Sequence, residues 1–191
     1  VTNEICESIR TAEGPDVDVV ICEIGGTVGD IESLPFLEAL RQFRFQEGRN
    51  NVLFIHVTLI PYLQKAGEVK TKPTQHSVGR LREIGIIPDI LICRSQVHLD
   101  KEVRRKLSLF CNVDEDGVAE ALDVKHTIYE IPIEFAAQNI DSVIIDYLGL
   151  RVGRRNLRPW HDYVDRVVNA EHEVNIAIVG KYSELLDSYK S

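Results

Sequence analysis

The stretch Val52-Leu53-Phe54-Ile55-His56-Val57-Thr58-Leu59-Ile60 carries the most information about the fold. It is a nearly continuous apolar run rich in Val and Ile, which is typical of a strand buried on both faces of a parallel sheet. Similar runs occur at residues 17–24 and 89–93. Because helical patterns separate the three runs, the sequence predicts an α/β fold with right-handed crossovers.

The segments between the runs have helical spacing. Apolar residues recur every three or four positions in residues 34–45, 73–84 and 101–110, which predicts three helices. Further along the chain we expect a short strand at residues 117–122 and a broken helix over residues 131–150. In such a sheet, ligands bind beyond the carboxyl ends of the strands.

The last forty residues predict the beginning of a second domain. Residues 149–160 are basic and resemble a connector, a helix is expected from about residue 160 to 170, and residues 174–181 predict a new strand. The chain contains no Met and stops soon after that strand. We therefore expect an internal fragment of a longer protein.

Composition excludes several classes of protein. The 191 residues include 22 basic and 30 acidic side chains, a net charge of −8, which argues against a broad nucleic-acid surface. The four cysteines form no CxxC pair, so reduced thiols in a cytoplasmic protein are expected. No apolar run approaches the ~20 residues that span a bilayer, so we expect no membrane association.

An acidic, glycine-rich segment follows the first apolar run, with the sequence Gly25-Gly26-Thr27-Val28-Gly29-Asp30-Ile31-Glu32-Ser33. Glu23, just before it, could ligate Mg²⁺, which prefers carboxylate oxygen, although position alone favours a solvated acid. Asp30 and Glu32 could accept hydrogen bonds from a base or sugar. Equally, they could stabilise the positive end of the next helix. The glycines could bring backbone N–H groups close to a ligand, but an ordinary turn is favoured.

A cationic segment follows the second run, with the sequence Lys70-Thr71-Lys72-Pro73-Thr74-Gln75. Proline suits the first turn of a helix, where free N–H groups and the helix dipole favour an anion. Phosphate binding is thus favoured over a solvated helix cap. The sequence contains no GxxxxGK[ST] loop, so an ATP site would need its main phosphate loop from elsewhere.

The other cations indicate no site by themselves. Arg104-Arg105-Lys106 predict a solvated helix face, and Arg151, Arg154, Arg155 and Arg158 predict a linker. The six histidines show no metal-binding spacing, and we assign them no chemistry.

Several long strings closely resemble the CTP synthase family. The two main ones are residues 22–36 and 67–77, and residues 87–95, 106–113 and 127–132 agree as well. The likeness covers essentially the whole chain. It implies a Rossmann-like, P-loop-related amidoligase domain with a mostly parallel sheet and flanking helices.

The resemblance also implies an activity. Members of this family use ATP and Mg²⁺ to phosphorylate O4 of UTP, after which ammonia displaces phosphate and gives CTP. The ammonia comes from glutamine, hydrolysed in a C-terminal glutaminase domain and passed through an internal tunnel. The family is homotetrameric, is activated by GTP and is inhibited by CTP.

The resemblance assigns roles residue by residue. Glu23 matches a Mg²⁺ ligand, and Lys106 matches a pyrimidine-nucleotide contact. The UTP and CTP contacts match Asp30, Ile31, Glu32, Lys70, Thr71, Lys72, Pro73, Thr74 and Gln75. The segment bordering the ATP adenosine matches Leu122, Asp123 and Val124. Leu122 departs from the family pattern, in which a lysine is expected.

The same resemblance divides the chain. It implies an amidoligase domain over residues 1–148 whose N-terminal part is missing, a linker over 149–172, and the start of the glutaminase domain over 173–191. The phosphate loop and the glutaminase triad then lie elsewhere, so none of the four cysteines is the nucleophile and the chain alone should lack turnover. The alternatives are a non-catalytic pyrimidine-nucleotide-sensing or assembly module, and an amidoligase or P-loop relative that uses another substrate.

Overall fold

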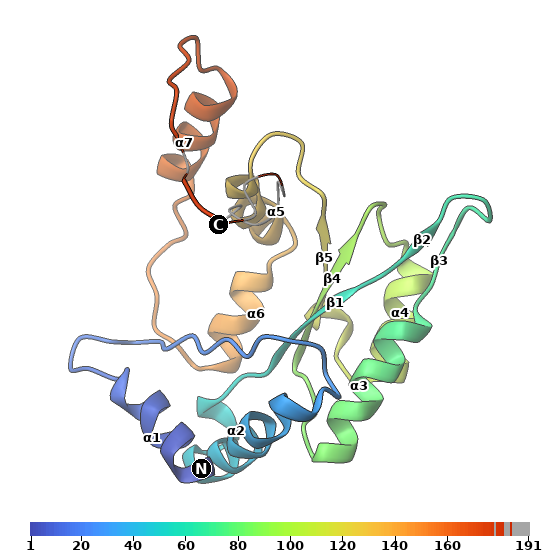
Figure 1. The fold of residues 1–191 in the computed structure, drawn as a ribbon, viewed down its shortest axis with the longest axis vertical. Helices are drawn as coiled ribbons and strands as arrows, with labels where there is room; N and C mark the ends of the chain where they lie inside the picture. The colour runs from blue at the N-terminus through green and yellow to red at the C-terminus, as the bar shows by residue number, and fades with distance from the viewer. Residues whose placement is uncertain (178, 182–183, 185–191) are drawn as a thin grey trace.

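The computed structural model describes residues 1–177, 179–181 and 184, and its centre is a parallel sheet (Figure 1). The sheet has the strand order β1–β4–β5, and both strand pairs are parallel. Its strands are β1 (Ile55–Leu59), β4 (Ile90–Ser95) and β5 (Val118–Leu122). The α/β fold with a mostly parallel sheet is confirmed.

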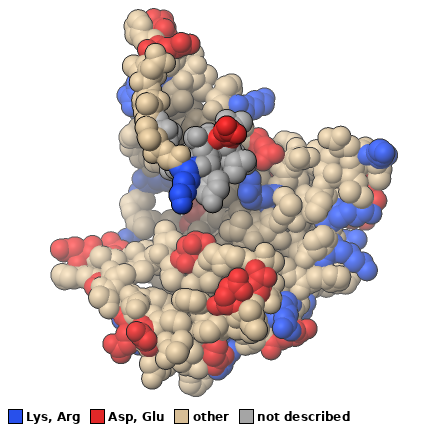
Figure 2. Space-filling model, viewed as in Figure 1, with Lys and Arg blue, Asp and Glu red and all other residues tan. Residues whose placement is uncertain are grey.

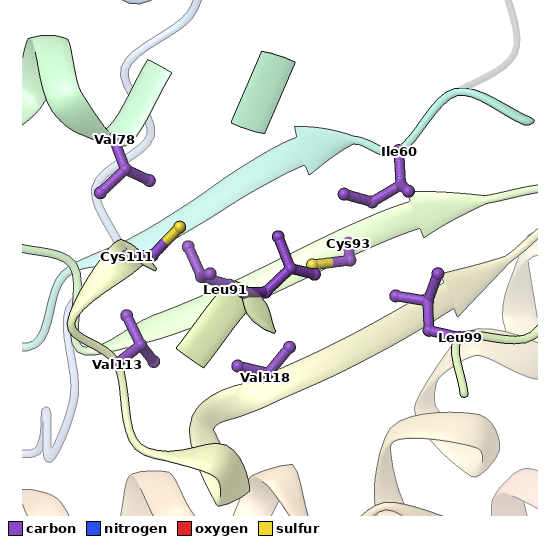
Figure 3. Packing of buried hydrophobic residues seen from close by; sticks show 9 residues of the cluster. Ile60, Val78, Leu91, Cys93, Leu99, Cys111, Val113 and Val118 are labelled. Atoms are coloured by element: carbon purple, nitrogen blue, oxygen red, sulfur yellow. The ribbon is translucent and has the colours of Figure 1, made fainter. Parts of the chain in front are cut away.

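Two crossover helices cover one face of the sheet. Helix α3 (Lys72–Ile84) lies between β1 and β4 in sequence, and α4 (Lys101–Cys111) connects β4 to β5. Val78 of α3 is fully buried in the same cluster as Leu91 of the central strand (Figure 3), and Leu107 of α4 is fully buried there too. The two predicted helices thus form where their apolar faces meet the sheet.

Two shorter helices cover the opposite face. They are α5 (Ile131–Ala137) and α6 (Ile140–Tyr147), as expected for a broken helix in this region. Ile140 packs against Ile90, Ile92 and Ala119. Because successive residues of a strand point to opposite faces, the central strand β4 is buried on both sides and the domain has three layers.

Further elements surround these layers. Helices α1 (Thr2–Thr11) and α2 (Leu34–Glu47) pack on each other through Cys6, Ala39 and Phe43. A hairpin of β2 (Tyr62–Leu63) and β3 (Glu68–Val69) was not expected from the sequence, whereas α7 (Arg158–Val168) was. The short 3₁₀ helices are Ile31–Ser33, Arg49–Asn51, Glu115–Gly117 and Ile128–Glu130.

None of the helices within the described residues is long and apolar enough to traverse a bilayer.

The predicted strand at residues 17–24 is wrong. This segment belongs to the long loop between α1 and α2 (Figure 1), and the side chain of Ile21 is 91% exposed. A strand needs a hydrogen-bonded neighbour, and no strand of the described chain pairs with this segment. Likewise, β1 is shorter than the predicted residues 52–60 and is not buried on both faces. Its alternate side chains Ile55, Val57 and Leu59 point to the same face of the sheet and are exposed.

The predicted strand at residues 174–181 is not observed in its described part. Residues 174–177 and 179–181 have no strand assignment, and Val174 and Ile176 are more than four-fifths exposed. Residue 178 lies outside the described residues, as do 182–183 and 185–191 of the expected second domain. A β-branched pattern indicates strand propensity, but pairing decides whether a strand forms.

Candidate functional site

The cationic segment lies where the β2–β3 hairpin leads into α3. The Lys70 N–H donates to the carbonyl of Pro61 at 2.8 Å, which fixes the end of the hairpin, and the Lys70 ammonium forms an ion pair with Glu68. Lys72 is the first residue of α3 and is exposed, and Pro73 occupies the first turn as expected. The free N–H groups of this helix start therefore belong to the same short segment as the two lysines.

The neutral residues of this segment hold the helix start in place. Thr71 and Thr74 are buried. The Gln75 side-chain amide donates to the Thr71 hydroxyl at 3.0 Å, and the hydroxyls of Thr74 and Thr58 are 2.9 Å apart. Because the Thr74 hydroxyl faces β1, its contribution is to anchor the first turn of α3 to the sheet.

A second polar bridge joins α3 to β1. The Ser77 hydroxyl lies 2.9 Å from Nε2 of His56, and burial lowers the pKa of His56. Burial disfavours the charged form, so the imidazole is held neutral against the helix. The sequence offered no signal for this bridge, because its two residues belong to different elements.

A cavity of about 370 Å³ opens between the hairpin and the start of α4. It is lined by Tyr62, Gly67, Glu68, Val69, Val97, His98, Asp100, Glu102, Val103 and Lys106. Lys106 thus lines the same cavity as Glu68, the ion-pair partner of Lys70. Figure 2 shows Lys and Arg gathered on the right of the view, over α3, α4 and the hairpin. The structure thus places Lys106 at the same cavity as the ion-pair partner of Lys70, which the pattern of α4 alone did not indicate.

The acidic segment lies farther along α3. Asp30 accepts a hydrogen bond from the Thr27 N–H at 3.2 Å, and both Ile31 and Glu32 are exposed. Val28 packs against a cluster that includes Leu81 of α3. Position 81 is about 13 Å along the helix axis from Lys72, at 1.5 Å per residue. Both polar segments contact α3, but convergence of the two on one ligand stays a prediction.

Glu23 is exposed and offers a single carboxylate. No group of three His, Cys, Asp or Glu side chains that could hold a metal occurs within residues 1–177 and the other described positions. Mg²⁺ is commonly held by one or two carboxylates together with phosphate and water. Glu23 therefore fits a Mg²⁺ ion that the phosphates of a bound nucleotide help to hold, and it does not fit a cage made by protein alone.

The proposed adenosine segment continues from the last strand. Leu122 is the last residue of β5 and is paired in register with Ser95 of β4, and Asp123 beyond it is exposed. Since the carboxyl ends of parallel strands share one edge, residues 122–124 lie at the edge of the sheet where ligands bind in α/β folds.

The interpretation of Arg104 as part of a solvated helix face is wrong. Its guanidinium donates to the carbonyl of Val118 at 2.9 Å and to the side chain of Gln138 at 3.3 Å, and it pairs with Glu120. A helical charge pattern cannot reveal partners that come from a strand and from the turn after another helix. His98 and His126, to which we assigned no chemistry, also pair with carboxylates.

Comparison with known proteins extends these observations. Residues 1–150 match the family described as "CTP synthase N-terminus". The whole chain is 53% identical to a CTP synthase of Caldanaerobacter subterraneus, 54% identical to one of Syntrophus aciditrophicus and 53% identical to one of Methanocaldococcus jannaschii. It covers 36%, 35% and 35% of their lengths, about a third in each case. The parallel sheet, the cationic start of α3 and these matches lead to one conclusion: the chain belongs to the CTP synthase family, in its N-terminal domain.

Proposed function

We propose that the protein to which this chain belongs is a CTP synthase that aminates UTP with ATP and glutamine-derived ammonia. O4 of UTP attacks the γ-phosphorus of ATP, which releases ADP. Ammonia then adds at C4, and the phosphate leaves with the former O4. The observation that carries this proposal is that Lys106 lines the same cavity as Glu68, the ion-pair partner of Lys70, in a chain that is more than 50% identical to CTP synthases over its whole length.

The cations are proposed to hold the pyrimidine nucleotide. Lys70, Lys72 and Lys106 would bind phosphates of UTP or CTP, because ammonium groups and free helix N–H groups both favour anions. Glu68 would release Lys70 when phosphate arrives. Thr71, Pro73, Thr74 and Gln75 would form the start of α3 that aims these groups, and Asp30, Ile31 and Glu32 would contact CTP.

The remaining assignments concern ATP and metal. Leu122, Asp123 and Val124 would border the adenosine, and Glu23 would supply one oxygen ligand to Mg²⁺. When bound, Mg²⁺ would neutralise charge on the phosphates. GTP is proposed as an allosteric activator, as the resemblance implies.

We further propose an arrangement for the longer protein. Residues 149–172 would link the synthase domain to a glutaminase domain that begins at residue 173. The family match ends at residue 150, whereas the relatives align across the whole chain, which supports a boundary there. A homotetramer in the cytoplasm is proposed from the resemblance, and sedimentation velocity would test the assembly.

The activity is tested with the full-length protein. We expect UTP, ATP, Mg²⁺ and glutamine or ammonia to yield CTP, measured by chromatography, and the 191-residue chain alone to yield none. Tight CTP binding without turnover by the full-length protein would favour the nucleotide-sensing module instead. ATP hydrolysis that does not depend on UTP would favour an amidoligase acting on another substrate.

Lys72→Ala in the full-length protein tests the cationic segment. A charge-assisted hydrogen bond contributes about 1.5–3 kcal/mol, so we expect the KM for UTP to rise about tenfold or more. Lys65→Ala is the matched control, because Lys65 is an exposed lysine in the turn of the neighbouring hairpin. An unchanged UTP affinity and turnover in the Lys72 variant would contradict the assigned role.

A further inference from the structure

A nearly buried carboxylate lies next to the cavity that Lys106 lines. The side chain of Glu120, on β5, is 12% exposed. Its carboxylate accepts the Leu99 N–H at 2.8 Å and pairs with Nδ1 of His98 at 2.9 Å and with Arg104 at 3.3 Å. These three partners come from the β4–α4 loop and from the first turn of α4. One side chain therefore joins β5 to the β4–α4 loop and the start of α4, whose residues line the cavity.

A second side chain holds the same residue at the edge of β5 that no strand of the described chain pairs with. The Gln138 side chain accepts the Glu120 N–H at 2.9 Å and donates to the Glu120 carbonyl at 2.8 Å. Arg104 donates to both Gln138 and the Val118 carbonyl. Both the side chain and the backbone of Glu120 are thus held just before the strand ends at Leu122.

The charge of Glu120 suits this arrangement. Burial raises the pKa of its carboxyl group. The Leu99 N–H, the His98 hydrogen bond and the positive charge of Arg104 together lower the pKa by more than burial raises it, so the net shift is downward. The carboxylate is therefore ionised at neutral pH. An ionised, nearly buried group with three partners defines the geometry of the loop more tightly than an exposed pair would.

This network lies between the two proposed nucleotide segments. Val97 and His98 line the cavity together with Lys106, and Lys106 follows Arg104 by two residues on α4. On the other side, Leu122 follows Glu120 by two residues, about 7 Å along the strand. We propose that Glu120, acting through Arg104 and the Leu99 amide, is a positioning residue. It would fix the β4–α4 loop, which would face UTP, relative to the end of β5, which would face ATP. The inference rests on the function proposed above.

Glu120→Gln in the full-length protein tests this inference. The variant keeps the size of the side chain and removes the charge that orients Arg104. We expect the KM for UTP to rise about tenfold, equivalent to about 1.4 kcal/mol, with a much smaller change in kcat. The KM for glutamine should not change, because the network does not involve ammonia production. A merely structural role would lower the active fraction, and hence kcat, without changing the KM for UTP.

Asp141→Asn is the matched control, because it removes a carboxylate charge from a more exposed ion pair with Arg155. If the wild-type protein makes CTP and both variants retain its KM for UTP, the positioning role is wrong although the proposed function stands. If the wild-type protein makes no CTP, the proposed function itself fails.

Hydrogen exchange of the wild-type protein keeps the inference testable if the Glu120 variant does not fold. Peptides covering residues 96–103 should exchange more slowly when UTP and a non-hydrolysable ATP analogue are added together. Unchanged exchange of these peptides in the presence of bound nucleotides would overturn the inference.

Discussion

Asp89 carries a nearly buried charge that several groups compensate. Its carboxylate pairs with Arg44 at 2.8 Å, accepts the Phe54 N–H at 2.8 Å and accepts the Tyr147 hydroxyl at 3.1 Å. The Arg44 guanidinium also lies 4.7 Å from the centre of the Phe54 ring. Burial is the main cause that raises the pKa of Tyr147. Side chains from α2, α6 and the start of β4 thus meet at the end of the sheet opposite the candidate site.

Asp89→Asn should destabilise the protein by about 3 kcal/mol or more, because the Arg44 charge would lose its counter-ion in a nearly buried position. Urea denaturation at neutral pH measures the effect. Asp141→Asn serves again as the control, since its more exposed pair with Arg155 should contribute at most about 1 kcal/mol. Equal losses in the two variants would contradict the importance of burial.

At the scale of the element, helix α3 connects the candidate site to the core. Its first turn bears the cationic segment, and Val78 and Leu81 are buried against the sheet and α2. It ends at Gly85, which has φ +90° and ψ 17° and whose N–H bonds to the Arg82 carbonyl. Only glycine adopts this left-handed conformation without strain.

Two alanine substitutions, one inside α3 and one directly after its last residue, should therefore have opposite effects on the free energy of unfolding. Gly85→Ala should cost about 1–2 kcal/mol, because the left-handed conformation penalises a Cβ and the new atom would lie 2.8 Å from Cδ of Arg41. Gly79→Ala should add about 0.5–1 kcal/mol, because Gly79 is in the helix interior and its Cβ would meet open space. Thermal unfolding of both variants gives the comparison, and a stabilised Gly85 variant would refute the assignment of the helix end.

At the scale of the whole molecule, several carboxylates link stability to pH. Hydrogen bonds from Arg41 and Gln42 lower the pKa of Glu38 to about 2. The pKa values of Glu120 and Glu130 are also lowered, because hydrogen bonds from His98 and His126 and from backbone N–H groups outweigh the effect of burial. All three groups release their protons more readily in the folded state than in the unfolded chain.

Stability should therefore fall with acid. Between about pH 4.5 and pH 2 the unfolded chain binds more protons than the folded protein, so the free energy of unfolding decreases as the pH falls. Thermal unfolding from pH 6 to pH 3 measures this slope. Glu38→Gln, which removes one of the linked groups, should make the slope shallower, and an unchanged slope would argue against the lowered pKa of Glu38.

Local sequence was sufficient for most elements of the domain. The spacing of Val78 and Leu81 predicted α3, and Pro73 and Gly85 lie at its two ends as the chemistry of helix termini requires. The cationic segment could be located for the same reason, because its residues are consecutive. The pairing of β strands could not be predicted in this way, and residues 17–24 have a strand-like pattern without a paired neighbour.

The sequence by itself determined the α/β class, the family and the position of the cationic helix start, because each depends on periodicity or on adjacent residues. Only the tertiary structure decided that Lys106 shares a cavity with Glu68, that Arg104 is bound by Glu120 and Gln138, and that Thr74 faces the sheet. Those contacts join residues that are 16 to 38 positions apart. The path of the chain through space places them together, and no local pattern encodes that path.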